Sequence, residues 1–266
     1  MRPVALVGSL SLDRVDGGRP RIGGASYHGG RALRLLGGRG RIVAKCGRAD
    51  RRELLPRLVA LGLPVTLWSG GATHAFSFRY NGDRRQMVVD TVGDPWRPDE
   101  LAGALAGVAA VHVAPLLRGD FPPDALAQAA RRRRLSLDGQ GLTRPRREGP
   151  LELDADFDHA LLEHVSILKL AEEEARVLVG EPSAAALREL GVREVVVTLG
   201  TRGSLVYANG RLERVEASPV PTTDPTGAGD AFAVTYLASR SDGHAPAASA
   251  RRATALVASL LAGRTR

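Results

Sequence analysis

Short apolar runs alternate with amphipathic segments along most of the chain. The apolar runs lack the strict alternation of half-exposed strands and are typical of strands buried on both faces of a parallel sheet. The runs that predict strands are residues 4–6, 42–47, 65–68, 110–113, 135–138, 165–169 and 194–199, and helical spacing marks residues 52–61, 99–105, 123–133 and 246–261. This order predicts an α/β fold, with a doubly wound, mostly parallel sheet and helices on both faces.

One part of the chain alternates apolar and polar residues instead. Residues 75–80 and 84–89 flank Asn81-Gly82-Asp83, a combination that favours a β-hairpin. An antiparallel hairpin is foreign to a doubly wound sheet, so we expect a small β lid formed by about residues 14–23 and 74–92. A lid suits a reaction from which water must be excluded. Its exposed edge could also pair with a second subunit in a homodimer.

Composition places the chain among globular proteins. The 266 residues are 44% hydrophobic, and neither a repeat nor a low-complexity linker divides them, so we expect a single domain over residues 1–266. The sequence shows no apolar run of membrane-spanning length and no signal-peptide pattern, which predicts a cytoplasmic protein without a membrane partner. The lone Cys46 excludes an internal disulfide.

The net charge of +8 raises nucleic-acid binding as an alternative. Lys45 and Lys169 are the only lysines, so the positive charge is nearly all arginine. The arginine run at 131–134 ends a predicted helix, where cations are favourable, and no aromatic residue is interleaved with it. We therefore expect no nucleic-acid partner, and a surface that attracts an anionic substrate such as a nucleoside triphosphate.

The candidate chemistry is concentrated in one stretch, Asp224-Pro225-Thr226-Gly227-Ala228-Gly229-Asp230-Ala231-Phe232, which opens an apolar-periodic helix. Its glycines let backbone amides approach a ligand, and the first turn of a helix presents free N–H groups to an anion. Asp230 stands in that turn, where it can act as base toward a hydroxyl that attacks a phosphoryl group. A capped helix start without any ligand explains the same residues. Neither a Walker A loop nor G-x-G-x-x-G fits, since no Lys-Ser/Thr follows and Phe232 takes the place of the third glycine.

This stretch closely resembles the D-T-T-G-A-G-D-A-F signature of the ribokinase-like (PfkB) carbohydrate kinases, with Pro225 as its one departure. The resemblance implies a ribokinase-like fold, with Asp230 as the catalytic base. It also implies that the amides of Gly227, Ala228 and Gly229 stabilise the charge of the transferring group.

Further matches follow the family in chain order. Gly8 and Asp13 match a glycine and an acid that binds sugar hydroxyls, and the loop at Gly23-Gly24 resembles one that lines the substrate pocket, with His28 in place of the usual Asn. Gln140, in a turn between two glycines, either helps to hold a polyol or only shapes that turn. The basic, proline-containing loop that follows at residues 144–149 is expected to lie on the surface. The segment matching T-x-G-x-x-G, which the family uses along the nucleotide, comprises Thr198, Gly200 and Gly203.

The remaining expectations concern the nucleotide and the metal. We expect Lys169, at the end of its strand, to contact the nucleotide, and the final helix either to pack the core or to form one wall of the adenine pocket. The family's N-x-x-E motif keeps its acid as Glu174, whereas Ala171 replaces the Asn. The resemblance therefore implies Mg²⁺ held by Glu174 through water, with ATP as co-substrate.

The sequence thus predicts an ATP-dependent kinase that phosphorylates a hydroxyl of a small polyol or monosaccharide. Weak local similarities at residues 23–27, 44–47 and 138–141 favour the inositol-kinase branch. Two alternatives stay open. A nucleoside kinase would use Phe76, Phe78 or Tyr80 as a platform for a base, and a degenerate member would bind ligand without transfer, as the changes at His28 and Ala171 suggest.

Overall fold

The structure is a computed structural model that describes residues 3–37, 40–81, 84–217, 220 and 225–263. Three positions named above, Gly82, Asp83 and Asp224, lie outside the described residues, as does the side chain of Tyr80.

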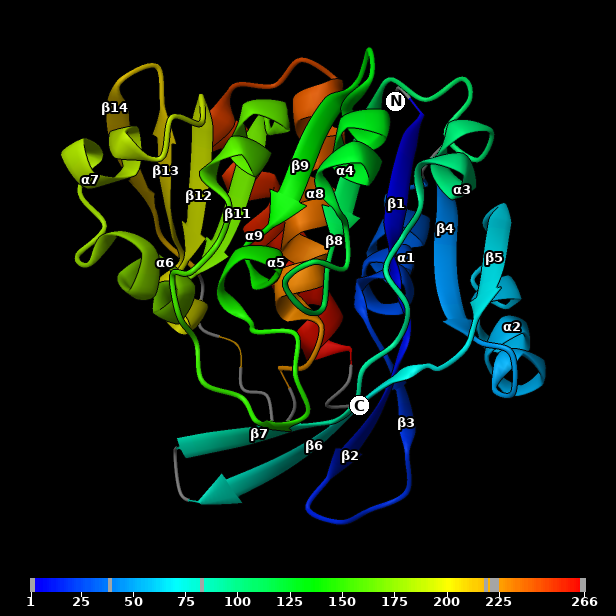
Figure 1. Cartoon of the computed structure of the whole chain (residues 1–266). Coiled ribbons are helices and arrows are strands. Elements are labelled where there is room, and N and C mark those ends of the chain that lie inside the picture. The colour runs from blue at the N-terminus through cyan, green and yellow to red at the C-terminus, as the bar shows by residue number, and fades with distance from the viewer. Residues whose placement is uncertain (1–2, 38–39, 82–83, 218–219, 221–224, 264–266) are drawn as a thin grey trace.

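A nine-stranded sheet forms the centre of the molecule, in the order β14-β13-β12-β11-β9-β8-β1-β4-β5 (Figure 1). The strands from β12 to β5 in this order run parallel, whereas β13 and β14 form an antiparallel hairpin at one edge. Their bounds are β1 Val4–Ser9, β4 Gly40–Gly47, β5 Val65–Gly70, β8 Ala110–Ala114, β9 Arg134–Asp138, β11 Ile167–Ala171, β12 Glu194–Thr198, β13 Ser204–Ala208 and β14 Arg211–Val215. The predicted doubly wound sheet is confirmed.

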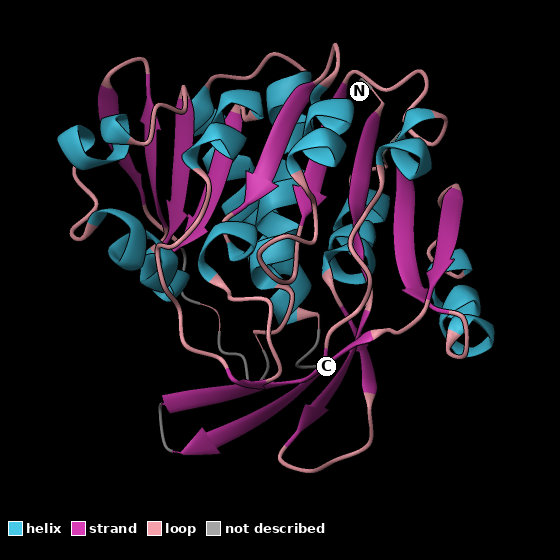
Figure 2. Cartoon of the chain, viewed as in Figure 1, coloured by secondary structure: helices cyan, strands magenta, loops and turns pink. Residues whose placement is uncertain are grey.

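Helices cover both faces of this sheet (Figures 1 and 2). On one face α8 packs against the strands and lies between α1 and α9, so that it buries apolar side chains on nearly all sides, among them Phe232 and Leu237. The other face packs Leu101 of α3 and Leu126 of α4 into a second core. The helices are α1 Ala25–Leu35, α2 Arg51–Val59, α3 Pro98–Ala102, α4 Pro123–Ala130, α5 Gln140–Thr143, α6 Glu172–Val179, α7 Ala184–Glu189, α8 Ala228–Ser241 and α9 Pro246–Ala262, with short 3-10 turns at His159–His164 and Gly200–Arg202.

A second sheet lies across the carboxyl ends of the parallel strands, below them in Figure 1. Its order is β10-β7-β6-β2-β3, with bounds β2 Ser11–Val15, β3 Arg21–Gly23, β6 His74–Asn81, β7 Arg84–Thr91 and β10 Gly149–Pro150. This sheet corresponds to the expected lid and is larger than expected. It begins at Ser11, so that Asp13 belongs to a lid strand, and it gains β10 from a loop that we had expected to lie on the surface.

The structure also differs locally from the sequence-based expectations. The helix expected over residues 123–133 ends at Ala130, because Arg132 takes a positive φ of 59° and Arg134 already begins β9. The turn expected around Gln140 is instead the first turn of α5, and α7 was not predicted.

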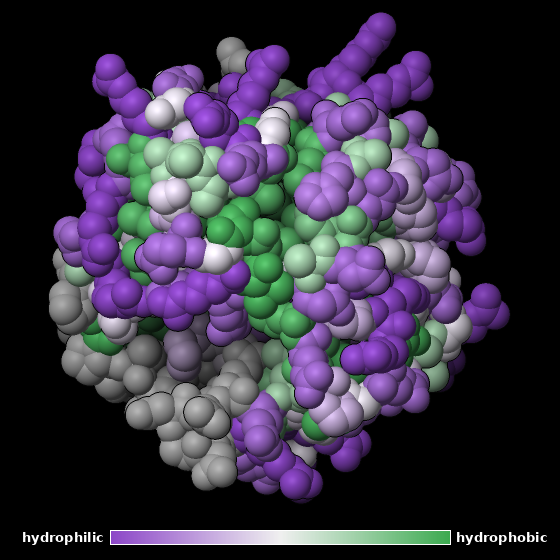
Figure 3. All heavy atoms as spheres, turned by 60° about the vertical axis from the view of Figure 1, so that its left-hand side comes forward, coloured by the Kyte–Doolittle hydropathy of each residue, from purple (hydrophilic) through white to green (hydrophobic). Residues whose placement is uncertain are grey.

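The face of the molecule on the β14 side is mainly polar (Figure 3). Seen with the β14 edge turned forward, hydrophilic residues cover most of the face around a narrower apolar strip (Figure 3). Among the described helices, none is both long and apolar enough to cross a membrane.

Candidate active site

The start of α8 places its first amides at the carboxyl ends of the parallel strands. Gly227 precedes the helix with a φ of 78°, a left-handed conformation that favours glycine. The space around it is also filled, because a Cβ at this position would lie 2.6 Å from Nδ1 of His28. His28 therefore packs against the expected anion-binding turn, in addition to lining the cavity described next.

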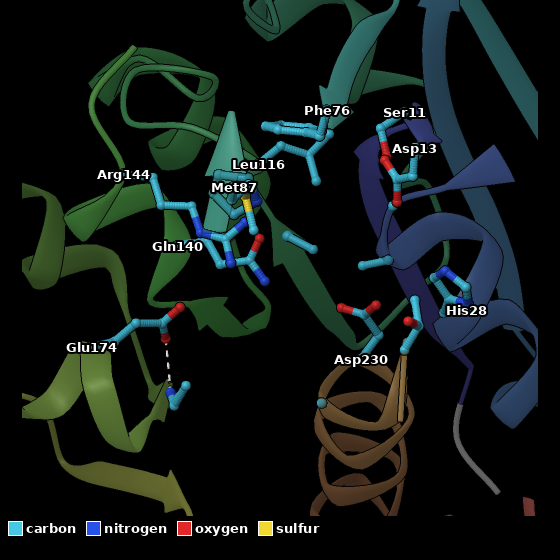
Figure 4. A pocket seen from close by; sticks show the side chains of 18 of the residues that line it. Ser11, Asp13, His28, Phe76, Met87, Leu116, Gln140, Arg144, Glu174 and Asp230 are labelled. Carbon is cyan, nitrogen blue, oxygen red and sulfur yellow. Dashed lines mark hydrogen bonds between the residues drawn. The ribbon is translucent and has the colours of Figure 1, made fainter. Parts of the chain in front are cut away.

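A cavity of about 220 Å³ lies between the lid and the main sheet. Figure 4 shows Asp13 and Ser11 entering from the lid, Asp230 from the start of α8, and Gln140 from the opposite wall. The residues expected from the sequence that line it are Asp13, Gly24, His28, Gln140, Lys169, Glu174, Gly227, Gly229 and Asp230. Gly23 lies directly beside it, since a Cβ there would approach Ser11 Oγ to 2.5 Å.

Side chains that were not expected to contact a polyol or sugar complete this cavity. Phe76, Phe78 and Met87 of the lid form an apolar wall with Leu116, and Arg144 reaches in beside Gln140 (Figure 4). The aromatic pair had been considered only for a nucleoside, and Arg144 had been assigned to a surface loop.

A buried ion pair stands at the floor of the cavity. Lys169 Nζ lies 3.2 Å from Asp138 Oδ2, and both side chains are nearly inaccessible to solvent. Burial alone would lower the pKa of Lys169, but the carboxylates of Asp138, Glu174 and Asp230 raise it above its usual value. The ammonium is therefore charged. It also approaches Gly229, because a Cβ there would lie 3.3 Å from Nζ.

Asp230 has the properties of a general base near neutral pH. Burial raises the pKa of its carboxyl to about 7, with a contribution from the negative charge of Asp138 and opposition from Lys169 and Arg144. A base is most effective when its pKa lies close to the operating pH.

Glu174 is the candidate for metal binding. Its Oε2 accepts a hydrogen bond from the amide of Ala171 at 2.8 Å, so this oxygen caps α6. Burial raises the pKa of Glu174, with repulsion from Asp138, while Lys169 and Arg144 lower it. The described residues contain no cluster of three or more metal-binding side chains. This arrangement fits Mg²⁺, which is commonly held by one or two carboxylates together with substrate phosphates.

A second cavity, of about 360 Å³, opens on the other side of the α8 turn. Its walls are mainly apolar, and of the residues expected at the nucleotide it contains Thr198, Gly200 and Gly203. Lys169 does not line it and belongs to the first cavity. The final helix α9 supplies one wall through Thr254, Val257, Ala258 and Leu261, so it does more than pack the core.

Comparisons with known proteins agree with this arrangement. A family model described as pfkB family carbohydrate kinase matches residues 22–265. The chain is 27% identical over 264 residues to a cytidine kinase of Thermococcus kodakarensis, covering 91% of this chain and 90% of that protein.

Solved structures are similar over nearly the whole chain. A pyrophosphate-dependent kinase in the ribokinase family, complexed with a pyrophosphate analog and myo-inositol, superposes with a TM-score of 0.84 at 23% identity and covers 97% of this chain and 94% of the other. A nucleoside kinase of Burkholderia thailandensis in complex with inosine gives a TM-score of 0.78 at 21% identity, with 97% and 90% covered.

The fold is thus that of the ribokinase-like kinases, and the chain belongs to the pfkB family of carbohydrate kinases. It is a phosphotransferase with an alcohol group as acceptor.

Proposed function

We propose that this kinase transfers the γ-phosphoryl group of ATP directly to a hydroxyl of a small polyol or monosaccharide. The observation that carries the proposal is the position of Asp230 in the first cavity, next to Gly229, which lines both cavities, and with a pKa raised to about 7. In this mechanism Asp230 takes the proton of the acceptor hydroxyl as its oxygen bonds to phosphorus. The bond to the departing ADP breaks in line with it.

The chain's own residues orient both reactants. Asp13, Gln140 and the loop at Gly24 are placed to hold acceptor hydroxyls, and the amides at the start of α8 are placed to stabilise charge on the transferring group. The lid excludes water, which would otherwise compete as acceptor. Glu174 would hold Mg²⁺ through water, and the ion would neutralise charge on the donor phosphates.

The apolar second cavity favours a nucleotide as donor. A base with a ribose needs such a cavity, whereas pyrophosphate, on which one of the similar solved kinases depends, does not. For the acceptor, the polar groups of the first cavity favour a polyol, in line with the myo-inositol bound by that same relative.

A nucleoside is the second candidate acceptor. Phe76, Phe78 and Met87 give the cavity an apolar wall that could contact a base, and the cytidine kinase is similar over most of the chain. Product analysis with ATP across inositols, hexoses, pentoses and nucleosides decides between them. Rapid turnover of a nucleoside with none of any polyol or sugar would overturn the first choice.

Replacement of Asp230 tests the proposed mechanism. Asp230→Asn keeps the shape of the side chain and removes its basicity, so we expect turnover to fall on the order of a hundredfold or more. ATP and acceptor affinities, measured by calorimetry, should stay within a few-fold of those of the unmodified protein. Undiminished turnover would remove Asp230 as the base. Binding of both ligands without ADP release by the unmodified protein would instead indicate a degenerate member.

A further inference from the structure

Three arginines converge near the junction of lid and main domain, and two of them are neutralised. Arg118 forms an ion pair with Asp154 and donates to the carbonyl of Leu142 at 3.0 Å. Arg146 forms an ion pair with the fully buried Asp120. These two guanidinium groups therefore have structural partners.

The third, Arg144, differs from them. Within the described part of the chain its side chain makes no ion pair or hydrogen bond, although its Nε is closed off from solvent. A buried N–H donor without an acceptor is costly, so a ligand that supplies an acceptor at this Nε is favoured. The backbone of Arg144 is fixed, since its amide donates to Gln140 and its carbonyl accepts from the amide of Arg118.

The position of Arg144 indicates what this ligand is. Arg144 lines the first cavity and not the second, and Figure 4 shows it on the opposite side of the cavity from Asp230. Arg144 and Lys169 are both part of the lining of the cavity that contains Asp230 and Gly229. The two cations therefore share one cavity with the proposed base and the start of α8.

The acceptor end of the same cavity is unsuited to an anion. Ser11 and Asp13 offer a hydroxyl and a carboxylate, which suit neutral hydroxyl groups, and Asp13 would repel a negative charge. Gln140 stands beside Arg144 on the opposite wall (Figure 4). In the proposed reaction one anion does enter this cavity. It is the phosphoryl group, which moves from the donor to the acceptor hydroxyl next to the amides at the start of α8.

We propose that Arg144 binds the non-bridging oxygens of the transferring phosphoryl group and is a further catalytic residue of this kinase. This inference rests on the proposed function. Arg144 exchanges no proton: the hydroxyl proton goes to Asp230, the new O–P bond forms, the bond to ADP breaks, and the guanidinium compensates charge on the phosphoryl oxygens throughout.

The test is steady-state kinetics of Arg144→Gln with a neutral acceptor. We expect kcat to fall on the order of 10²-fold to 10³-fold while KM for the acceptor changes less than about threefold. Arg147→Gln is the matched control, because Arg147 is exposed in the same loop and loses the same charge. It should keep full activity. Arg144→Lys, which retains a charge, should lose about tenfold.

Several results would overturn the proposal. Unchanged kcat in Arg144→Gln would do so, as would a loss confined to acceptors that carry a carboxylate or phosphate. Equal losses in Arg144→Lys and Arg144→Gln with equally lowered thermal midpoints would assign the effect to packing. If the unmodified protein transfers phosphate to no acceptor, the proposed function fails by itself. Calorimetry with pyrophosphate alone then decides on Arg144: binding weakened about tenfold in Arg144→Gln supports it, and unchanged binding refutes it.

Discussion

Asp230 is held in an environment that costs stability when it is ionised. Burial raises the pKa of its carboxyl from about 3.8 to about 7, so the folded state binds this proton more tightly than the unfolded state. The folded state consequently loses stability as pH rises between these values. The same shift makes the carboxylate an effective base just above neutrality.

This environment predicts opposite effects of pH on activity and stability. We expect kcat/KM to rise with pH through about 7 and then level off, because the base must be deprotonated. Asp230→Asn should raise the free energy of unfolding at pH 8 by on the order of 1–3 kcal/mol relative to the unmodified protein, and this gain should vanish near pH 4. Denaturant unfolding at both pH values measures it, with the exposed Asp156→Asn as a control that should show no such gain.

At the scale of elements, the lid is attached through a buried polar cluster. His74 stands at the start of β6, and its Nδ1 accepts a hydrogen bond from the amide of Gly93 at 3.2 Å. Its Nε2 lies 3.5 Å from Oδ2 of Asp120. The carboxylate of Asp120 accepts from the amides of Leu116 and Leu117 at 2.9 and 3.0 Å and also pairs with Arg146. The side chain of Asp120 thus connects β6 of the lid with Leu116 in the wall of the first cavity.

Asp120→Asn should weaken that attachment. The substitution keeps the size of the side chain but leaves Arg146 without its counter-charge, and we expect a loss of roughly 1–3 kcal/mol in the free energy of unfolding. KM for the acceptor should rise several-fold with KM for ATP nearly unchanged, because Leu116 lines only the first cavity. The control is Asp124→Asn on the exposed start of α4. It should alter neither the free energy of unfolding nor KM for the acceptor. An equal rise in both KM values would contradict this account of the lid.

The edge strands of the lid sheet are where a second subunit could pair. β3 and β10 are the edge strands of the lid sheet, and a dimer formed through them stays a prediction that sedimentation would test.

At the scale of the whole molecule, the sites proposed for donor and acceptor are two separate cavities. Ala258→Trp would fill part of the second cavity. We therefore expect KM for ATP to rise on the order of tenfold or more, while KM for the acceptor stays unchanged. Ala255→Trp, on an exposed position of the same helix, is the control. Any turnover with pyrophosphate should be insensitive to both substitutions. An unchanged KM for ATP in Ala258→Trp would mean that the nucleotide binds elsewhere.

The same scale shows what the sequence could predict. The order of strands and helices and the stretch around Asp230 are local patterns, and the structure has them where the sequence indicated. The pairing of Asp138 with Lys169 is not local, because it depends on the register of β9 against β11. Arg144 was misassigned for a similar reason: the two-residue strand β10 pairs with Val88 and Val89 of the lid and brings its loop toward the cavity, and so short a strand has no readable pattern.

Among the described lining residues, the two cavities share only Pro225 and Gly229. Substitutions at Phe76, Met87 or Leu116, in the wall proposed for the acceptor, should therefore leave the wall proposed for the nucleotide intact. A laboratory could redesign which alcohol is phosphorylated and which phosphate source is consumed as two independent problems, and then combine the solutions in one chain.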